Sequence, residues 1–457
     1  MTDTTSYDAM VIGSGQGGNP LAAALAKRGE RVVIIESGPL GGTCINTGCT
    51  PTKTLIGSAQ VAHYARNAAR WGVRASDVSV DLPAILKRKE EIVHGMRSGW
   101  EQSFGGPGQA RLLRGQARFV GPKQVQVGDE VLHGERIFID TGTRPAIAKV
   151  AGLDSVPYLT NVSLLEATVV PEHLIVLGGG YVGLEFGQMF RRFGSEVTVI
   201  QSAERILPRE DEDVTAELQN ALEAEGIRFL LGARAARAEG REGEVRVTMT
   251  GGESVTGSHL LVATGRVPNT EELDLAKTGV ETDEKSFIVV NERLETSAPG
   301  IWAIGDVTGG PAFTHISYND FQIIYGNLYE GKNLSTKTRL VPYAVYTDPT
   351  LGRVGMTEAA ARQSGKKLKI GKVPMTRVVR ARERGETAGF MKLVVDGETD
   401  RILGATILSV EAGELVQILS TLMLAEKPYT LLKGAIYIHP TLAEGFFGLM
   451  DSVKAVQ

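Results

Sequence analysis

Cysteine is scarce in this sequence, and long apolar segments are missing from it. The 457 residues include two cysteines, Cys44 and Cys49. That is too few for a four-ligand zinc site, and the histidines are scattered, so we expect no metal. No apolar run reaches the ~20 residues that a membrane-spanning helix needs. The polar N-terminus lacks the basic segment that begins a signal peptide, so we expect a cytoplasmic protein that does not bind membranes.

An excess of positive charge is missing as well. The chain has 49 Lys and Arg against 53 Asp and Glu, a formal net charge of −4, and such a balance does not indicate a nucleic-acid-binding protein. The clearest basic segment, residues 377–384, is interrupted by Glu383 and followed by Glu386, which is typical of a solvated or subunit-facing surface. The chain is too long for one hydrophobic core, and we expect about three domains.

Two segments share one plan: an apolar strand, a Gly-x-Gly-x-x-Gly turn, a helix and a second apolar strand. The first segment spans residues 7–36 and the second residues 173–201. Glycines at this spacing let the backbone approach a pyrophosphate, which the N-terminus of the following helix stabilises. Because the strand and the helix flank both turns, the sequence predicts two Rossmann-like dinucleotide-binding domains. The glycines concerned are Gly13, Gly15 and Gly18 in the first turn, and Gly178, Gly180 and Gly183 in the second.

The repeat extends beyond the two turns. Residues 137–145 and 260–268 each place a strand before a Thr-Gly-x-x-Pro motif, which contains Thr141 and Gly142 in the first copy and Gly265 in the second. The second strands end on Glu36 and Gln201, each 23 positions after the first glycine of its turn. A carboxylate at this place can accept a hydrogen bond from an adenosine ribose. We therefore expect Glu36 to bind one dinucleotide, and Gln201 to face the other without that charge.

The cysteines lie five positions apart in a segment that should be irregular. In a regular helix, Cα atoms at this spacing are roughly 8.6 Å apart, beyond the ~7 Å limit for a disulfide. Gly48 can relieve the backbone, and a helix that begins nearby would favour a thiolate. In a reducing compartment, so close a pair indicates redox chemistry rather than a scaffold disulfide.

The cysteine motif resembles that of the class I pyridine nucleotide-disulfide oxidoreductases, the family of dihydrolipoamide dehydrogenase, glutathione reductase and mercuric reductase. The matching residues are Gly41-Gly-Thr-Cys-Ile-Asn-Thr-Gly-Cys-Thr-Pro-Thr-Lys53, and the resemblance resumes at residues 300–306, 341–349 and 439–444. It implies FAD and NADH or NADPH as cofactors. It also implies an α/β fold with an FAD-binding domain at 1–150, an NAD(P)-binding domain at 151–271, a return to the FAD domain at 272–341, and an α+β dimerisation domain at 342–457.

The resemblance implies roles for the residues around the flavin. Cys49 is the charge-transfer thiol that faces it, and Cys44 is the interchange thiol that attacks the substrate. Lys53 reaches the flavin and pairs with Glu185, since two charges beside a flavin are costly unless paired. Tyr181 resembles the aromatic gate over the flavin, although ordinary packing is the alternative.

His439 and Glu444 are the acid–base pair by the same resemblance. Imidazole titrates near neutrality and can exchange a proton with Cys44, and a carboxylate can orient the ring. In the family this pair reaches the dithiol of the opposite subunit, which implies an obligatory homodimer with shared active sites.

The resemblance also implies further cofactor contacts, for which it gives only the region of the cofactor. Asp306 is expected at the ribityl or pyrophosphate region of FAD, and Ala117 at its adenine. His315 lies either close to the flavin pyrimidine or in a purely structural place. The remaining candidates for cofactor binding are Thr43, Lys53, Thr141, Gly142, Gly265 and Gly305.

The resemblance leaves the electron acceptor open among several relatives. The His439–Glu444 pair also fits dihydrolipoamide dehydrogenase, but the NAD-binding acid of that enzyme is here Gln201. Mercuric reductases normally add a C-terminal cysteine pair, which is missing from residues 451–457. The bacterial flavoproteins that protect against reactive chlorine species and hypothiocyanous acid resemble the chain at Gln201 and at Leu207-Pro-Arg-Glu-Asp211. We therefore predict reduction of a small disulfide or a thiol-reactive oxidant. A redox-sensing switch without turnover is the non-enzymatic alternative.

Overall fold

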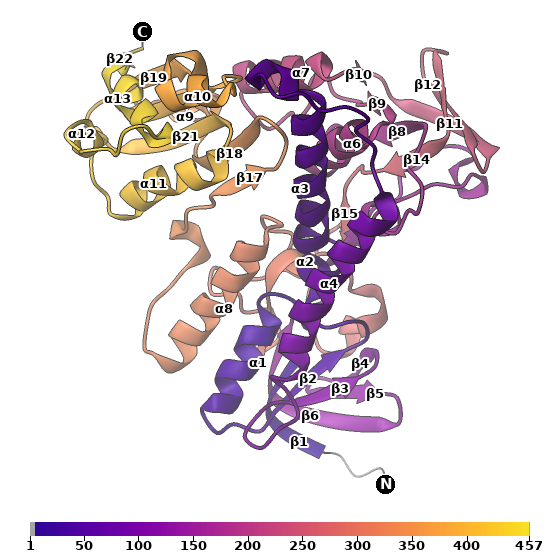
Figure 1. The fold of residues 1–457 in the computed structure, drawn as a ribbon. Helices are drawn as coiled ribbons and strands as arrows, with labels where there is room; N and C mark the ends of the chain where they lie inside the picture. Colours follow the sequence, from indigo (N-terminus) through magenta and orange to yellow (C-terminus); the bar gives the residue numbers. More distant parts are fainter. Residues whose placement is uncertain (1–4, 457) are drawn as a thin grey trace. The chain divides into compact units, whose positions relative to one another are not determined.

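The computed structural model describes residues 5–456, which divide into two compact units. Unit 1 holds the residues up to Leu55, Pro83–Ala146 and Gly265–Arg339. Unit 2 holds Ile56–Leu82, Ile147–Thr264 and the residues from Leu340 onward. Strands and helices alternate through much of the chain (Figure 1), so the expected α/β fold is confirmed. The four domain ranges given above remain predictions.

Unit 1 is built on a mixed sheet with strand order β3-β2-β1-β6-β5-β4, in which β16 also pairs with β6. The pairs β3–β2, β2–β1, β1–β6 and β6–β16 are parallel, as in a dinucleotide-binding fold. Two short strands, β7 and β15, pair antiparallel and bring the two Thr-Gly-x-x-Pro segments side by side. The strands are β1 (Thr5–Ile12), β2 (Val32–Glu36), β3 (Arg111–Arg114), β4 (Ala117–Gly121), β5 (Gln124–Val127), β6 (Glu130–Ile139), β7 (Thr143–Pro145), β15 (Arg266–Pro268) and β16 (Ile301–Ala303).

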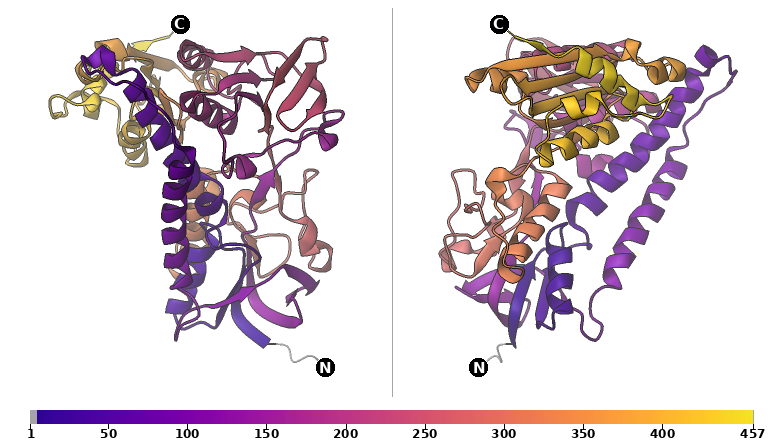
Figure 2. Two further views of the ribbon diagram at one scale, coloured as in Figure 1. Left: turned by 45° about the vertical axis from the view of Figure 1, so that its right-hand side comes forward. Right: turned by 90° about the vertical axis from the view of Figure 1, so that its left-hand side faces the viewer.

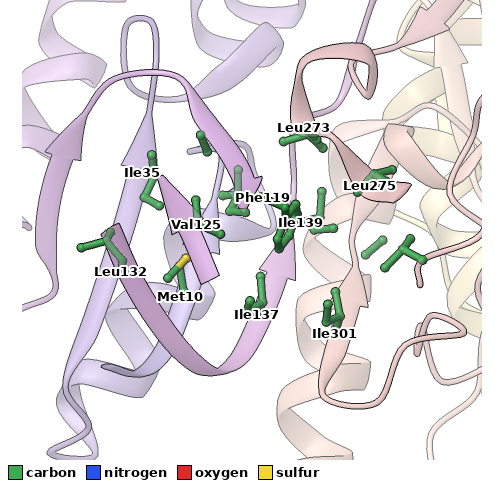
Figure 3. Packing of buried hydrophobic residues seen from close by; sticks show 14 of the residues in the cluster. Met10, Ile35, Phe119, Val125, Leu132, Ile137, Ile139, Leu273, Leu275 and Ile301 are labelled. Atoms are coloured by element: carbon green, nitrogen blue, oxygen red, sulfur yellow. The ribbon is translucent and has the colours of Figure 1, made fainter. Parts of the chain in front are cut away.

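The central strands of this sheet are apolar on both faces, so both faces must be covered. Four successive residues of β2, Val32–Ile35, are buried. One face packs against Leu21 and Leu25 of α1, and the other forms a core with β4 and β5 (Figure 3). The helices of the unit are α1 (Gly18–Lys27), α2 (Gly42–Asn46), α4 (Leu82–Glu101) and α8 (Thr314–Tyr329), and α3 (Cys49–Arg66) begins here and continues in unit 2.

Unit 2 contains a second parallel sheet, with strand order β10-β9-β8-β14. It repeats the plan of unit 1, because β8, α6 and β9 follow one another as β1, α1 and β2 do. The expected pair of Rossmann-like segments is thus confirmed. The elements are β8 (His173–Leu177), β9 (Glu196–Ile200), β10 (Ile227–Leu230), β14 (His259–Val262), α5 (Asn161–Leu164), α6 (Tyr181–Phe193), α7 (Glu212–Ala224), and an antiparallel sheet of β11 (Ala235–Arg241), β12 (Glu244–Met249) and β13 (Ser254–Gly257).

An antiparallel sheet with order β17-β18-β21-β20-β19-β22 completes unit 2. Helices α11 and α13 pack on it in one apolar cluster that includes Leu419 and Phe446, and Figure 2 shows these helices along the strands. The strands are β17 (Tyr343–Val345), β18 (Thr350–Gly355), β19 (Leu368–Pro374), β20 (Phe390–Asp396), β21 (Ile402–Ser409) and β22 (Lys454–Ala455). The helices are α9 (Glu358–Gln363), α10 (Val379–Arg384), α11 (Ala412–Leu424), α12 (Thr430–Lys433) and α13 (Gly445–Asp451).

The Leu207–Asp211 segment connects the second dinucleotide turn to this antiparallel part of unit 2. The Leu207 N–H donates to the carbonyl oxygen of Gly179 at 3.0 Å. The Asp211 carboxylate accepts the N–H groups of Glu358 and Ala359, at 3.0 and 3.1 Å, and thereby caps α9. Residues 207–211, which from the sequence alone show only a family resemblance, therefore join two parts of unit 2.

Candidate active site

Cys44 and Cys49 lie on two different helices, which confirms the expected irregular segment. Cys44 belongs to the short helix α2, and Cys49 is the first residue of α3. Gly48 lies between the helices, where an added Cβ would come within 2.8 Å of the Thr43 carbonyl oxygen. The Asn46 side chain donates hydrogen bonds to the Gly42 and Leu40 carbonyl oxygens, at 2.8 and 3.0 Å, and so stabilises the turn before α2. The two cysteines are not joined by a disulfide in this structure.

Thr314 is a site residue that the sequence did not single out. Its Oγ1 lies 3.1 Å from Sγ of Cys49, and it is the first residue of α8. Cys49 thus lies at the N-terminus of one helix and contacts the N-terminal residue of another, and helix N-termini favour negative charge. His315 stacks on Phe313 with ring centroids 5.5 Å apart, and its proximity to the flavin remains a prediction.

The two thiols influence each other's ionisation. A hydrogen bond that the Cys44 thiol donates to Cys49, burial and the negative charge of Cys49 raise the pKa of the Cys44 thiol, while a hydrogen bond with Thr314 and the charge of Lys53 lower it. Cys44 therefore keeps its proton when the pair is reduced. We expect the single negative charge of the pair to lie on Cys49, at the start of α3.

A cavity of about 690 Å³ opens at the carboxyl ends of β1, β2 and β6 in unit 1. In parallel α/β sheets this edge is where dinucleotides bind. Residues predicted to bind a cofactor contribute much of its lining, namely Gly13, Gly15, Glu36, Thr43, Ala117 and Thr141. Gly18 begins the helix that follows the turn. The structure therefore brings together six predicted contacts that are spread over more than a quarter of the chain.

Glu36 is held in place by the turn itself. Its carboxylate accepts hydrogen bonds from the Ser14 N–H at 2.9 Å, from the Ser14 hydroxyl at 2.6 Å and from the Gly38 N–H at 2.7 Å. A fixed acceptor at the end of β2 suits the ribose of an adenosine, as predicted.

Two further observations agree with dinucleotide binding at this cavity. A Cβ on Gly13 would come within 2.2 Å of the Asp140 carbonyl oxygen, so the turn can lie this close to the end of β6 only with glycine. The Thr141 hydroxyl is buried and has no hydrogen-bond partner within residues 5–456, which is a group that a bound polar ligand would satisfy. Asp306 lies nearby in unit 1, where it accepts a hydrogen bond from the Thr143 hydroxyl at 2.9 Å.

The remaining glycine candidates occupy strained or crowded backbone positions. Gly142 has φ +64°, Gly305 has φ +69° and Gly265 has φ +150°, values that favour glycine. The Gly305 N–H donates to Asp320 Oδ2 at 2.8 Å. Their contacts with a cofactor remain predictions.

The second turn, in unit 2, resembles the first. Gly178 has φ +112°, against +101° for Gly13, and Gly180 is the residue before α6. An added Cβ on Gly183 would come within 2.0 Å of the Gly178 carbonyl oxygen. Gln201 Oε1 accepts the Gly179 N–H at 3.1 Å, where Glu36 accepts that of Ser14 in the first repeat.

Glu185 and Tyr181 are both on α6, which follows the second turn. The Glu185 carboxylate is buried and accepts the Tyr346 N–H at 2.8 Å. Tyr181 is the first residue of the helix and is exposed. Lys53 belongs to unit 1 and Glu185 to unit 2, and their pairing stays a prediction.

His439 and Glu444 form a hydrogen-bonded pair. The ring Nδ1 lies 2.9 Å from Glu444 Oε1, and the other carboxylate oxygen accepts the Thr441 N–H at 2.8 Å. These two interactions hold the pKa of Glu444 below its usual value. The carboxylate therefore remains ionised into the acidic range and can fix the orientation of the exposed ring.

Comparison with known proteins now places this geometry in a family. The family model "Pyridine nucleotide-disulphide oxidoreductase" matches residues 7–320, and the model of its dimerisation domain matches residues 341–448. The chain belongs to this family. It is 37% identical to the probable pyridine nucleotide-disulfide oxidoreductase RclA of Escherichia coli, over 98% of this chain and 99% of that protein.

Other members are similarly related. A dihydrolipoyl dehydrogenase of Thermus scotoductus is 37% identical, over 99% of this chain and 97% of the relative. A mercuric reductase of Lysinibacillus sphaericus is 37% identical, over 90% of this chain and 76% of the relative. The solved structure of the HOCl-induced flavoprotein disulfide reductase RclA from Escherichia coli matches with a TM-score of 0.91, over 98% of this chain and all of the other.

Family membership confirms the reaction class predicted from the sequence. The chain is an oxidoreductase that acts on sulfur groups, with FAD and NAD(P)H as its cofactors. It carries the dimerisation domain of the family. Among residues 5–456, no helix is long and apolar enough to cross a membrane.

Proposed function

We propose that Cys44 and Cys49 are the redox-active dithiol, with Cys44 as the thiol that meets the substrate and Cys49 as the thiolate next to the flavin. The contact of Cys49 with Thr314, at the first turns of α3 and α8, carries this assignment. The raised pKa of Cys44 supports it, because a protonated Cys44 needs a base before it can attack.

His439 is proposed as that base. Its ring, oriented by Glu444, takes the proton of Cys44 and later returns it to the leaving group. The dimerisation domain supports a second part of the proposal, that His439 acts on the dithiol of the partner subunit. Lys53, Glu185 and Tyr181 are proposed to line the flavin in the roles implied by the resemblance. FAD, when bound, supplies the transfer of two electrons from NAD(P)H to the oxidised cysteine pair.

The proposed acceptor is a small thiol-reactive oxidant such as hypothiocyanous acid. The Cys44 sulfur attacks the sulfur of HOSCN and displaces hydroxide, which leaves as water with the proton held by His439. The Cys49 thiolate then attacks Cys44, releases thiocyanate and closes the disulfide. The net reaction of HOSCN with NAD(P)H gives thiocyanate, water and NAD(P)⁺. The match to RclA over nearly the full length of both chains supports this choice.

Dihydrolipoamide oxidation is a second candidate. It is supported by the full-length relative from Thermus scotoductus and by the intact His439–Glu444 pair. A third relative, mercuric reductase, raises the question of Hg(II). Because the chain has only two cysteines, Hg(II) would meet the active pair directly and stay bound as a stable dithiolate, so we expect inhibition.

Steady-state assays on the purified flavoprotein separate these acceptors. NADH and NADPH oxidation would be followed with hypothiocyanous acid, with a small disulfide, and with Hg(II) in excess thiol; NAD⁺ reduction would be followed with dihydrolipoamide. The expected result is rapid turnover of hypothiocyanous acid, none in Cys44→Ser protein, and inhibition by Hg(II). Faster turnover of dihydrolipoamide would favour the second candidate, and sustained mercury-dependent oxidation would refute the inhibition argument. Absence of turnover with all of these acceptors would favour the redox-sensing alternative.

A further inference from the structure

Asp140 is the point at which the first dinucleotide-binding repeat departs from the second. It follows β6 directly, and its N–H donates to the Ile12 carbonyl oxygen at 2.7 Å. In the second repeat the same backbone place belongs to Ala263, whose N–H donates to the Leu177 carbonyl oxygen at 2.9 Å. One repeat thus carries a carboxyl group where the other carries a methyl group.

The carboxyl group of Asp140 lies beneath the glycine turn of the FAD cavity. The residue is 6% exposed and contributes to the cavity lining. Its Oδ2 accepts a hydrogen bond from the Gly18 N–H at 2.7 Å. This N–H is the first backbone donor of α1, and the residue that satisfies it lies 122 positions later in the chain. The packing is close, because a Cβ on Gly15 would come within 2.6 Å of the same oxygen.

The surroundings of Asp140 are acidic. Burial raises the pKa of Asp140 well above its usual value, the Gly18 N–H lowers it, and the carboxylates of Asp306, Asp320 and Glu36 raise it further. Two cations near these acids pair with the neighbouring carboxylates: Arg339 binds Asp320, and Arg266 lies 3.8 Å from Asp306. FAD brings a negatively charged pyrophosphate to this same helix N-terminus, where an ionised Asp140 would repel it.

We propose that Asp140 is a positioning residue for FAD that works as a neutral carboxylic acid, capping α1 below the pyrophosphate-binding turn. Ionisation of Asp140 then weakens FAD binding. At low pH, Asp140 is fully protonated. As the pH rises through the raised pKa, Asp140 loses its proton, so the affinity for FAD falls toward alkaline pH. The inference rests on FAD binding alone and is independent of the acceptor and of the dithiol roles.

Release of FAD from the holoprotein tests this proposal. The dissociation constant would be measured by flavin fluorescence between pH 5.5 and about 9.5 for wild-type, Asp140→Asn, Asp140→Ala and Asp129→Asn proteins. Above the pKa of Asp140, wild-type affinity should fall by up to about tenfold per pH unit, which is the limit for one linked proton. Asp140→Asn should bind FAD with little pH dependence, because the amide oxygen still accepts the Gly18 N–H. Asp140→Ala should bind FAD more weakly at every pH.

Asp129 is the matched control, because it is exposed, in the same unit and outside the cavity lining. Asp129→Asn should follow the wild-type profile. Identical pH profiles for wild-type and Asp140→Asn proteins would overturn the proposal. If the variants fail to fold, infrared spectra of wild-type holoprotein decide: a carbonyl band of a protonated, buried carboxyl group should be present at pH 7, and its absence would also overturn the proposal.

Discussion

Thr314 is the residue whose contact with the dithiol is most open to direct test. Its Oγ1 lies 3.1 Å from Cys49 Sγ, and a hydrogen bond to a charged group contributes about 1.5–3 kcal/mol. We expect Thr314→Val to raise the pKa of the Cys49 thiolate by roughly one to two units. In a Cys44→Ser background, where Cys49 cannot form the disulfide, the thiolate–flavin charge-transfer absorption reports this titration.

Thr314→Ser is the control for that experiment, because it keeps the hydroxyl and removes only a methyl group. It should titrate close to the Cys44→Ser parent. If Thr314→Val and its parent titrate at the same pH, the hydroxyl does not stabilise the thiolate. A Cys44→Ser protein without any charge-transfer absorption would instead show that the assignment of the two thiols is wrong.

Local motifs indicated single candidate residues, but they did not reveal contacts between distant residues. Cys44, Cys49 and Glu36 could be proposed from the sequence because helix geometry and motif spacing act over a few residues. Thr314 contacts a residue 265 positions away, and Asp140 accepts from one 122 positions away. Neither contact leaves a local pattern. The internal repeat did contain a signal for Asp140, since its counterpart is Ala263.

At the scale of elements, we expect the residues that follow β9 to influence the choice between NADH and NADPH. Gln201 Oε1 accepts the Gly179 N–H, and its Nε2 donates to the Arg205 carbonyl oxygen at 3.3 Å. The side-chain amide is therefore held by backbone on both sides and presents no negative charge to a 2′-phosphate. We expect the two coenzymes to differ in kcat/KM by about tenfold or less, or ~1.4 kcal/mol.

Gln201→Glu should shift this ratio toward NADH by about tenfold or more, because a carboxylate repels the 2′-phosphate. Measurement of kcat/KM for both coenzymes checks this, with Gln363→Glu, an exposed position on α9, as the control for added charge. A wild-type preference of a thousandfold would mean that residues outside 201–205 determine specificity. A variant that prefers NADPH would contradict the electrostatic argument.

Elements with a strong pattern were predicted correctly, and their connections were not. The apolar strands and glycine turns of both repeats are where the sequence places them. In contrast, the role of residues 207–211 depends on Asp211 as the cap of a helix that begins 147 residues later. A single sequence shows that an acid is present there but not which helix it caps.

At the scale of the whole molecule, the surface around His439 indicates a partner. Ile436 is 100% exposed and Ile438 is 80% exposed in the single chain. Two largely exposed isoleucines so close together are unusual on a monomer and typical of an interface. They lie within the matched dimerisation domain, a few residues from the acid–base pair. The reaction class followed from motifs within one chain, whereas no motif of the chain identifies the acceptor.

The trans arrangement can be tested by mixing two inactive proteins. Cys44→Ser subunits and His439→Ala subunits would be combined in equal amounts under conditions of subunit exchange. If His439 serves the dithiol of the partner, each mixed dimer has one site with both defects and one intact site. Random exchange makes half of the dimers mixed, so activity should return to roughly a quarter of the wild-type value. Mixing Cys44→Ser with Cys49→Ser is the control and should restore nothing, because both cysteines must come from one subunit. Verified exchange without recovered activity in the first mixture would show that His439 acts within its own chain.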